Sequence, residues 1–217
     1  MKRALVCCLA IFVGLSGCAS YAPTSAPSPK SSSLPFTVTE GYVTVGADPY
    51  TQADRLKACF GGNLNEAGVL PIQVMIRNDG DRKILVRPSD VLLVLPGGGQ
   101  FCPSGASAAA SKMESIGGVV ASGIAFGLIG VLVASSAEDK ARGARLEDFK
   151  RKELQEARLG PGESASGFLY FVPPPGTKAF SQADVVFCPV DMDDATSSAV
   201  KLPLSRLDFK EVKQTEQ

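Results

Sequence analysis

The 217-residue sequence contains no histidine and no tryptophan. Histidine is the commonest general base and the commonest metal ligand in proteins, so its absence excludes the usual catalytic triads and histidine-based metal sites. The chain also has no surplus of either charge, with 22 basic and 22 acidic residues. A nucleic-acid-binding surface normally requires a basic surplus. We therefore expect no nucleic-acid partner, no metal ion, no cofactor and no enzymatic activity.

The N-terminus has the organisation of an export signal. Lys2 and Arg3 precede an uncharged apolar run over residues 4–15, which is too short for a membrane span of about 20 residues. The run ends in Leu15-Ser16-Gly17-Cys18. These four residues resemble the lipobox of bacterial prolipoproteins. The resemblance implies removal of residues 1–17 as a signal peptide and acylation of Cys18 with chains such as palmitate. The alternative is an ordinary secretory signal in which the cysteine occurs by chance.

The residues after Cys18 indicate where the mature chain is held. Acyl chains on Cys18 imply a membrane as the first partner and the cell envelope as the location. Ala19 and Ser20 follow the cysteine, and the lack of Asp there favours the outer membrane, by analogy with lipoprotein sorting. Residues 18–35 are rich in Ser, Pro and Ala. Such a composition offers no face to bury and predicts an extended tether.

From Phe36 onwards the pattern is that of short strands. Runs of β-branched and aromatic residues predict strands over residues 36–45, 69–77, 84–86, 90–95, 166–172, 183–190 and 199–204. Residues 52–60 predict a short helix, and Asn78-Asp79-Gly80-Asp81 predicts a tight hairpin turn. About seven short strands with close turns are typical of an immunoglobulin-like antiparallel β-sandwich. We expect this mainly β domain to comprise residues 36–102 and 165–210.

Residues 111–160 interrupt the strands and predict an inserted helical hairpin. Its first arm contains 23 uncharged residues between Glu114 and Glu138, enough for a helix of about 34 Å. Small residues there have the spacing of a glycine zipper, which lets helices approach closely in lipid; they are Gly118, Ser122, Gly123 and Gly127. Residues 115–137 are therefore predicted to form a transmembrane helix or to contact another copy of the chain. The alternative is a buried core helix in a water-soluble domain.

The second arm, residues 137–158, has 13 charged residues among 22. Glu138–Arg142, Glu147–Arg151 and Asp148–Lys152 are acid–base pairs at the i,i+4 spacing that stabilises a solvated helix. A helix with so many charges cannot cross a bilayer by itself. Since both ends of the insert join the same predicted sandwich, they must lie on one side of any membrane. The apolar arm is then shielded by the charged arm, by other copies or by shallow insertion into the anchoring leaflet.

Three cysteines lie beyond the lipobox, at positions 59, 102 and 188. An oxidising envelope permits a disulfide, and Cys102 and Cys188 share a Phe-Cys-Pro setting, so we predict that these two pair and leave Cys59 reduced. The alternative is three small buried hydrophobic residues. The acidic residues at positions 191, 193 and 194 lack the pattern of a calcium-binding loop. They are interpreted as a solvated turn.

The whole sequence loosely resembles uncharacterised bacterial envelope lipoproteins that combine a lipobox, a β-sandwich and a glycine-rich apolar insert. The resemblance is specific for residues 1–20 and implies no activity. The leading hypothesis is a non-enzymatic, membrane-anchored module that binds an unknown envelope protein or assembles with itself through residues 115–137. The alternative is an oligomeric pore-forming or membrane-remodelling component. An enzyme that uses carboxylates alone is a third hypothesis.

Overall fold

The computed structural model describes residue 21 and residues 34–117, 128–173 and 183–204, apart from the side chains of residues 115–138. Within these residues the fold is mainly β, with three antiparallel sheets and few helices. The first sheet has the order β1-β2-β3-β8, with bounds Phe36–Glu40, Val43–Pro49, Leu70–Asn78 and Ser164–Phe171. The second has the order β11-β9-β5-β6, with bounds Val200–Pro203, Asp184–Phe187, Val91–Val94 and Gln100–Phe101. A small third sheet has the order β10-β4-β7, with bounds Val190–Asp191, Ile84–Val86 and Ala157–Leu159.

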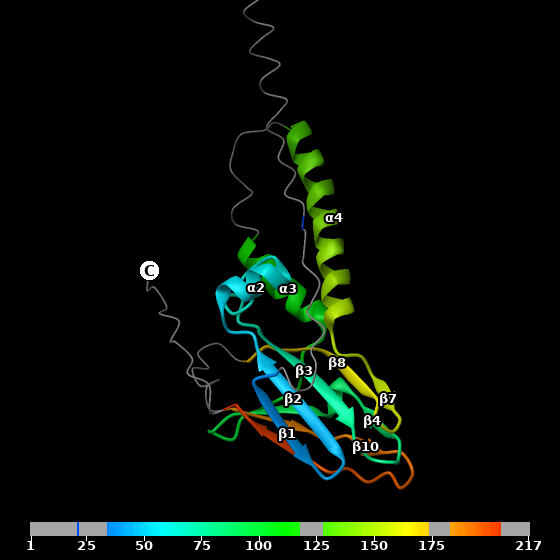
Figure 1. Cartoon of the computed structure of the whole chain (residues 1–217). Coiled ribbons are helices and arrows are strands. Elements are labelled where there is room, and N and C mark those ends of the chain that lie inside the picture. The colour runs from blue at the N-terminus through cyan, green and yellow to red at the C-terminus, as the bar shows by residue number, and fades with distance from the viewer. Residues whose placement is uncertain (1–20, 22–33, 118–127, 174–182, 205–217) are drawn as a thin grey trace, which may run out of the picture.

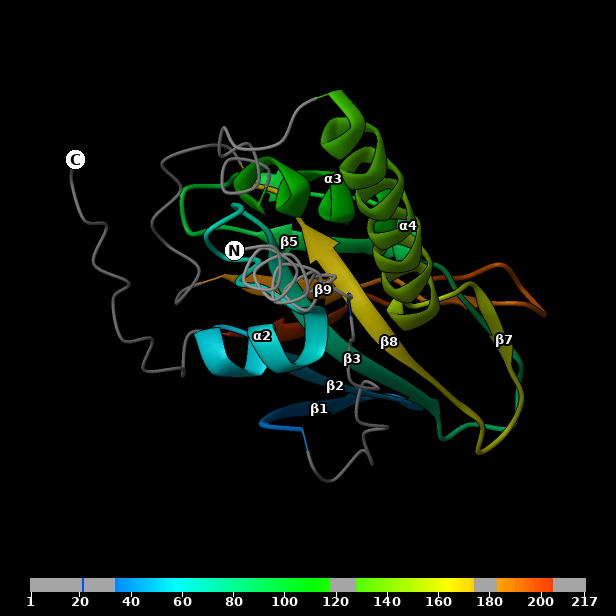
Figure 2. The same ribbon diagram turned by 90° about the horizontal axis from the view of Figure 1, so that it is seen from above.

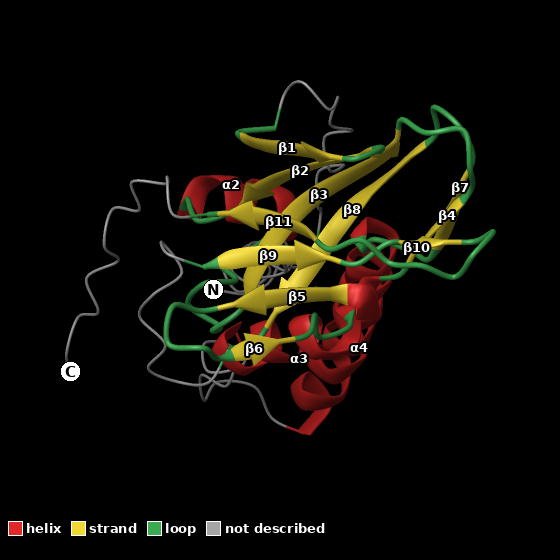
Figure 3. Ribbon diagram, turned by 90° about the horizontal axis from the view of Figure 1, so that it is seen from below, coloured by secondary structure: helices red, strands yellow, loops and turns green. Residues whose placement is uncertain are grey.

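The helices lie on one side of the first sheet (Figures 1 and 2). Within the described residues they are α2 (Ala53–Phe60), α3 (Ala106–Gly117) and α4 (Leu128–Lys152), and a 3-10 turn, η3, covers Pro88–Asp90. Seen from below, the second sheet covers the other side of the molecule, with β10, β4 and β7 at its edge (Figure 3). The architecture is therefore a helical layer, a central sheet and an outer sheet.

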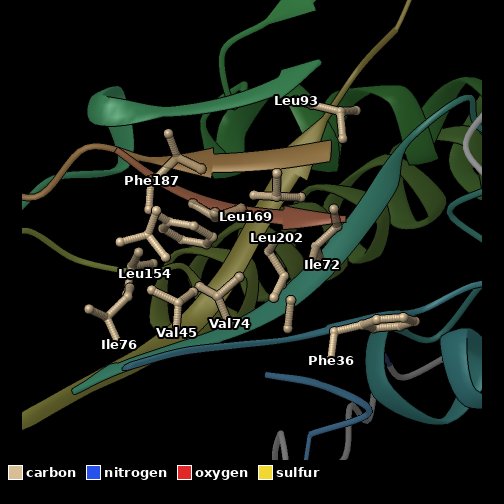
Figure 4. Close-up of a cluster of buried hydrophobic side chains, with 14 of the residues drawn as sticks. Phe36, Val45, Ile72, Val74, Ile76, Leu93, Leu154, Leu169, Phe187 and Leu202 are labelled. Atoms are coloured by element: carbon tan, nitrogen blue, oxygen red, sulfur yellow. The ribbon is translucent and has the colours of Figure 1, made fainter. Parts of the chain in front are cut away.

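Strand β3 shows why the first sheet lies in the middle. Ile72, Val74 and Ile76 alternate along it and are buried between the two larger sheets (Figure 4). The intervening Gln73 and Met75 point to the opposite face and are only 3% and 5% exposed. A sheet with one solvated face would leave these two positions in water. Both faces of β3 are covered, so the strand is buried along almost its whole length.

The inserted stretch leaves and returns beside the same strand, β8. The Ser104 amide donates to the Tyr170 carbonyl (2.6 Å) and the Leu154 amide donates to the Phe168 carbonyl (2.9 Å). The Glu153 carboxylate at the end of α4 also accepts a hydrogen bond from the Ala106 amide at the start of α3 (2.9 Å). The bases of α3 and α4 are thus fixed together on the outer face of the central sheet, whereas the far end of α4 stands away from all strands (Figure 1).

Three local predictions were wrong. Residues 36–45 are two strands rather than one, because Gly41 adopts a positive φ of 57° and turns the chain. The Asn78–Asp81 turn does not make a hairpin, because β3 pairs with β2 and β8 while β4 pairs with β7 and β10. The charged helix ends at Lys152 rather than Arg158, because residues 157–159 pair with β4 as strand β7.

Two features of the predicted fold stay predictions. The described strands form facing sheets, but an immunoglobulin-like connectivity is not established by them. The small residues of the predicted glycine zipper, Gly118, Ser122, Gly123 and Gly127, lie outside the described residues. The predicted boundary between the apolar and the charged arm at residue 137 is wrong, because α4 continues without a break from Leu128 to Lys152. Among the helices that the structure describes, none combines the length and the apolar character needed to span a bilayer. The prediction of a transmembrane helix therefore has no support from the described part of the chain.

Candidate functional site

A buried charged pair in the helical layer is the starting point for a candidate site. Asp148 and Lys152 lie one turn apart on α4, and their side chains are only 2% and 3% exposed. The Lys152 ammonium donates to Asp148 Oδ2 (2.6 Å). Burying such a pair is costly unless further hydrogen bonds satisfy both groups. The further hydrogen-bond partners of Asp148 and Lys152 therefore identify the segments that this pair holds together.

Lys152 finds its second partner on α2. Its ammonium donates to the carbonyl oxygen of Cys59 in the last turn of that helix. The C-terminal end of a helix carries partial negative charge from its free carbonyl groups, so it stabilises a cation there. The ammonium also lies 5.2 Å from the centre of the Phe60 ring, which is within range of a cation–π contact. Lys152 thus joins α4 to α2.

Asp148 finds its further partners on α4 and in the N-terminal segment. Arg151 donates to Asp148 Oδ1 (2.7 Å) from the solvent side. The hydroxyl of Tyr21 donates to Asp148 Oδ2 (3.0 Å). Burial, followed by the neighbouring negative charge of Asp148, raises the pKa of Tyr21, so its hydroxyl remains a neutral donor at physiological pH. One carboxylate therefore receives hydrogen bonds from three side chains.

The ring of Tyr21 occupies a position prepared by α2 and α4. Gly61 ends α2 with a positive φ of 73°, and a Cβ there would come within 2.8 Å of the Tyr21 ring. Only glycine combines this conformation with such a close approach. The Arg145 guanidinium lies 5.2 Å from the ring centre on the α4 side. We call the surroundings of Tyr21, formed by Gly61, Arg145, Asp148 and Lys152, the Tyr21 site.

An aromatic cluster beneath the Tyr21 site packs α2 and α4 against the central sheet. Phe60 of α2, Phe149 of α4 and Tyr170 of β8 are fully buried, with ring centres 5.2 to 6.0 Å apart. The Tyr170 hydroxyl donates to the Phe149 carbonyl (3.1 Å). Burying each such side chain stabilises the fold by about 1.5–3 kcal/mol. The helices that hold Tyr21 are therefore fixed to the central sheet rather than loosely attached.

The acidic residues near β10 form a second polar cluster at the other end of the molecule. Asp191 is buried and accepts hydrogen bonds from Tyr42 (3.1 Å) and Arg82 (3.2 Å). Arg82 also donates to Asp194 (2.8 Å). Hydrogen bonds from Thr196, followed by that from Arg82, lower the pKa of Asp194 to about 2. The interpretation as a solvated turn is wrong for Asp191, because its side chain is buried. The described residues contain no cluster suited to a metal ion.

The predicted disulfide between Cys102 and Cys188 is absent from the structure, in which both thiols are free. Cys102 follows β6 and Cys188 follows β9, and β5 lies between these two strands. Adjacent strands are about 4.8 Å apart, so two neighbouring spacings exceed the Cα separation of about 4.4–6.8 Å that a disulfide allows. Cys59 is also free, and it is buried.

The three thiols are expected to react in a fixed order. Cys102 is exposed, Cys188 is half-buried and Cys59 is buried, and burial raises the pKa of both Cys59 and Cys188. Because the thiolate is the reactive form, a maleimide should label Cys102 first, Cys188 more slowly and Cys59 only after unfolding. Peptide mass spectrometry without reduction measures this order. Detection of a peptide pair linked through Cys102 and Cys188 would show that the predicted disulfide does form.

The sequence-based site residues and the Tyr21 site overlap little. Cys18 lies outside the described residues, as do the four small residues of the insert. Of the three predicted i,i+4 pairs, the structure forms Asp148–Lys152, whereas Glu147 pairs with Lys150. Tyr21 was missed because it lies in a Ser/Pro-rich segment. Its only signal was that a large aromatic residue is unusual in a tether.

No protein-family model matches the sequence, and no curated protein matches it. The ycdA protein of Bacillus subtilis, provisionally described as a lipoprotein, is 15% identical with a TM-score of 0.41, and the match covers 78% of this chain but only 38% of that one. The yjhA protein of the same species is 14% identical, with a TM-score of 0.37 and coverage of 77% and 96%. A protein of unknown function from Listeria monocytogenes is 10% identical, with a TM-score of 0.36 and coverage of 77% and 80%. With TM-scores below 0.5, these likenesses assign no function to the chain.

Proposed function

We propose that the protein is a non-enzymatic lipoprotein of the bacterial cell envelope, anchored through Cys18. The observation that carries this proposal is the apolar run that ends in Leu15-Ser16-Gly17-Cys18. Docking of Tyr21 on Asp148 supports it. Tyr21 is only three residues after Cys18, so this contact would hold the domain at a defined position beside the lipid anchor. The lack of Asp after Cys18 supports the outer membrane as the final location.

Replacing Cys18 with serine tests the anchor. The hydroxyl cannot accept the diacylglyceryl group in place of the thiol, so the variant should remain uncleaved and should lose acyl labelling. Metabolic labelling with palmitate and intact mass measurement give the readouts. A matched Cys102→Ser variant removes an exposed thiol more than 80 residues after the signal in the sequence and should be processed normally. A Cys18→Ser variant that is cleaved and acylated like the parent contradicts the proposal.

The anchored domain acts in this proposal as a structural or protein-interaction module. The facing sheets would form an immunoglobulin-like sandwich, and α3 and α4 would be the two arms of the inserted helical hairpin. The binding partner is an envelope protein or a second copy of the chain. Edge strand β1 is a suitable contact, because among the described strands it pairs only with β2 and a partner strand can add to such an edge.

Photo-crosslinking in intact cells tests this contact. A photoreactive residue at Glu40, which is exposed on β1, should give a discrete crosslinked protein. The same residue at Lys150, exposed on α4, provides the control and should not give that product. The pore-forming alternative depends on close helix packing through the small residues at positions 118, 122, 123 and 127, which lie outside the described part of the chain.

A further inference from the structure

The length of chain between Cys18 and Tyr21 limits the distance from the domain to the membrane. Three residue steps separate the two positions, and an extended chain covers at most about 3.3–3.6 Å per residue. Cys18 must then lie within about 11 Å of docked Tyr21. A free tether over residues 18–35 would have held the domain much farther away. Tyr21 therefore shortens the effective anchor to its first few residues.

The position of the sheets determines which side of the molecule can face the membrane. The Tyr21 site lies in the helical layer, and both larger sheets lie on the opposite side of that layer from the free end of α4 (Figure 1). A flat bilayer that approaches within about 11 Å of Tyr21 must lie on the helical side, because the sheets occupy the other. The view from above in Figure 2 is then the view from the membrane.

Helix α4 provides an independent measure of the same distance. Asp148, the partner of Tyr21, is ten residues from Glu138, the first charged residue of α4. At about 1.5 Å per residue this is about 15 Å along the axis, similar to the reach of the chain from Tyr21 to Cys18. Residues 128–137 of α4 carry no charge and extend about 15 Å further. Half of the hydrocarbon core of a bilayer is also about 15 Å thick.

We infer that docking of Tyr21 places the uncharged N-terminal part of α4, residues 128–137, in the same lipid leaflet that holds Cys18. This inference rests on the lipid anchor proposed above. Two distances support it: the reach of the chain from Tyr21 to Cys18, and the distance along α4 from Asp148 to Glu138. The charged residues from Glu138 onwards remain in water, whereas the uncharged residues 128–137 are surrounded by acyl chains. The domain then stands upright with its sheets away from the membrane.

Tryptophan fluorescence tests the inference cleanly, because the chain contains no tryptophan. Acylated protein is reconstituted into vesicles of phosphatidylethanolamine and phosphatidylglycerol that carry brominated acyl chains. A Leu132→Trp variant reports on α4, and a Met192→Trp variant reports on an exposed position beside β10. Each reporter is also combined with Tyr21→Ala, and with Thr24→Ala as a control within the same tether. Leu128→Trp provides a second reporter in case Leu132→Trp disturbs folding.

We expect the bromine atoms to quench Leu132→Trp several-fold more strongly than Met192→Trp. Tyr21→Ala should reduce this difference, and Thr24→Ala should leave it unchanged. Equal quenching at both positions, or strong quenching that persists with Tyr21→Ala, would overturn the inference while the anchor stands. An unquenched, blue-shifted Leu132→Trp in an oligomer would show that another copy covers α4, which also overturns it. Protein that lacks acyl chains on Cys18 and does not sediment with vesicles would contradict the proposed function itself.

Discussion

Replacing Asp148 with alanine is expected to lower the free energy of unfolding by about 3–5 kcal/mol, the cost of leaving a buried charge without its partner. Lys152 is 3% exposed and, among the described residues, would keep the Cys59 carbonyl as its hydrogen-bond acceptor. Tyr21 would lose the acceptor of its hydroxyl as well. The loss should therefore appear both as lower stability and as release of the N-terminal segment. Urea denaturation of the detergent-solubilised protein measures the first effect.

Glu147 provides the control, because it precedes Asp148 on the same helix and is 72% exposed. Its replacement with alanine should change stability by at most about 1 kcal/mol, as is usual for surface ion pairs. The double variant Asp148→Leu with Lys152→Met exchanges the buried pair for apolar side chains and should recover most of the lost stability. If Asp148→Ala and Glu147→Ala had equal effects, the pair would not be buried in solution.

Replacing Gly167 with alanine is expected to destabilise the fold by about 3 kcal/mol, at the upper end of the range for overpacking. A Cβ at this position of β8 would come within 2.5 Å of the backbone nitrogen and Cα of Leu154. Backbone atoms cannot move aside as the end of a flexible side chain can. The return of the inserted stretch would have to separate from β8 and break the Leu154–Phe168 hydrogen bond. Thermal unfolding measures the effect.

Gly143 is the matched control for this substitution. It lies in the exposed part of α4, and a Cβ there meets no atom within 4 Å. Alanine is favoured over glycine inside a helix by about 1 kcal/mol, so Gly143→Ala should stabilise the protein. Opposite signs for the two glycine substitutions would show that close backbone approach, and not the loss of glycine, causes the defect. A neutral Gly167→Ala would place Leu154 farther from β8 than the structure does.

Strand positions could be predicted from the sequence far better than strand pairing. Alternation along β3 is visible because side chains of a strand point to opposite faces in turn. Pairing depends on partners distant in the chain, and the Asp79–Gly80 turn has hairpin chemistry although both edges of β3 are occupied by β2 and β8. The charged residues do form a helix, but neither of its predicted bounds is right: α4 already includes residues 128–136, which were assigned to the apolar arm, and it ends at Lys152. Residues 157–159 have helical neighbours in sequence and strand partners in space.

The candidate site shows a different limit. The Asp148–Lys152 spacing was visible as an i,i+4 pair, but the same pattern occurs on solvated helices. Burial of this pair comes from α2, from the aromatic cluster and from Tyr21, and no local pattern records those contacts. The Tyr21 site also depends on Gly61, whose role becomes clear only when the ring is seen against it. Tertiary contacts, not residue types, distinguish this site from an ordinary helix surface.

The central pairing of β3 with β8 has a consequence for the order of folding. Leu70 pairs with Phe171, about 100 residues later in the chain, and the stretch between them includes both α3 and α4. Contacts between distant residues form slowly, because a long loop must close before they contribute. A chain exported from its N-terminus would complete its central sheet only after residue 171 has crossed. It would thus remain unfolded, and fit for passage through a narrow channel, for most of its translocation.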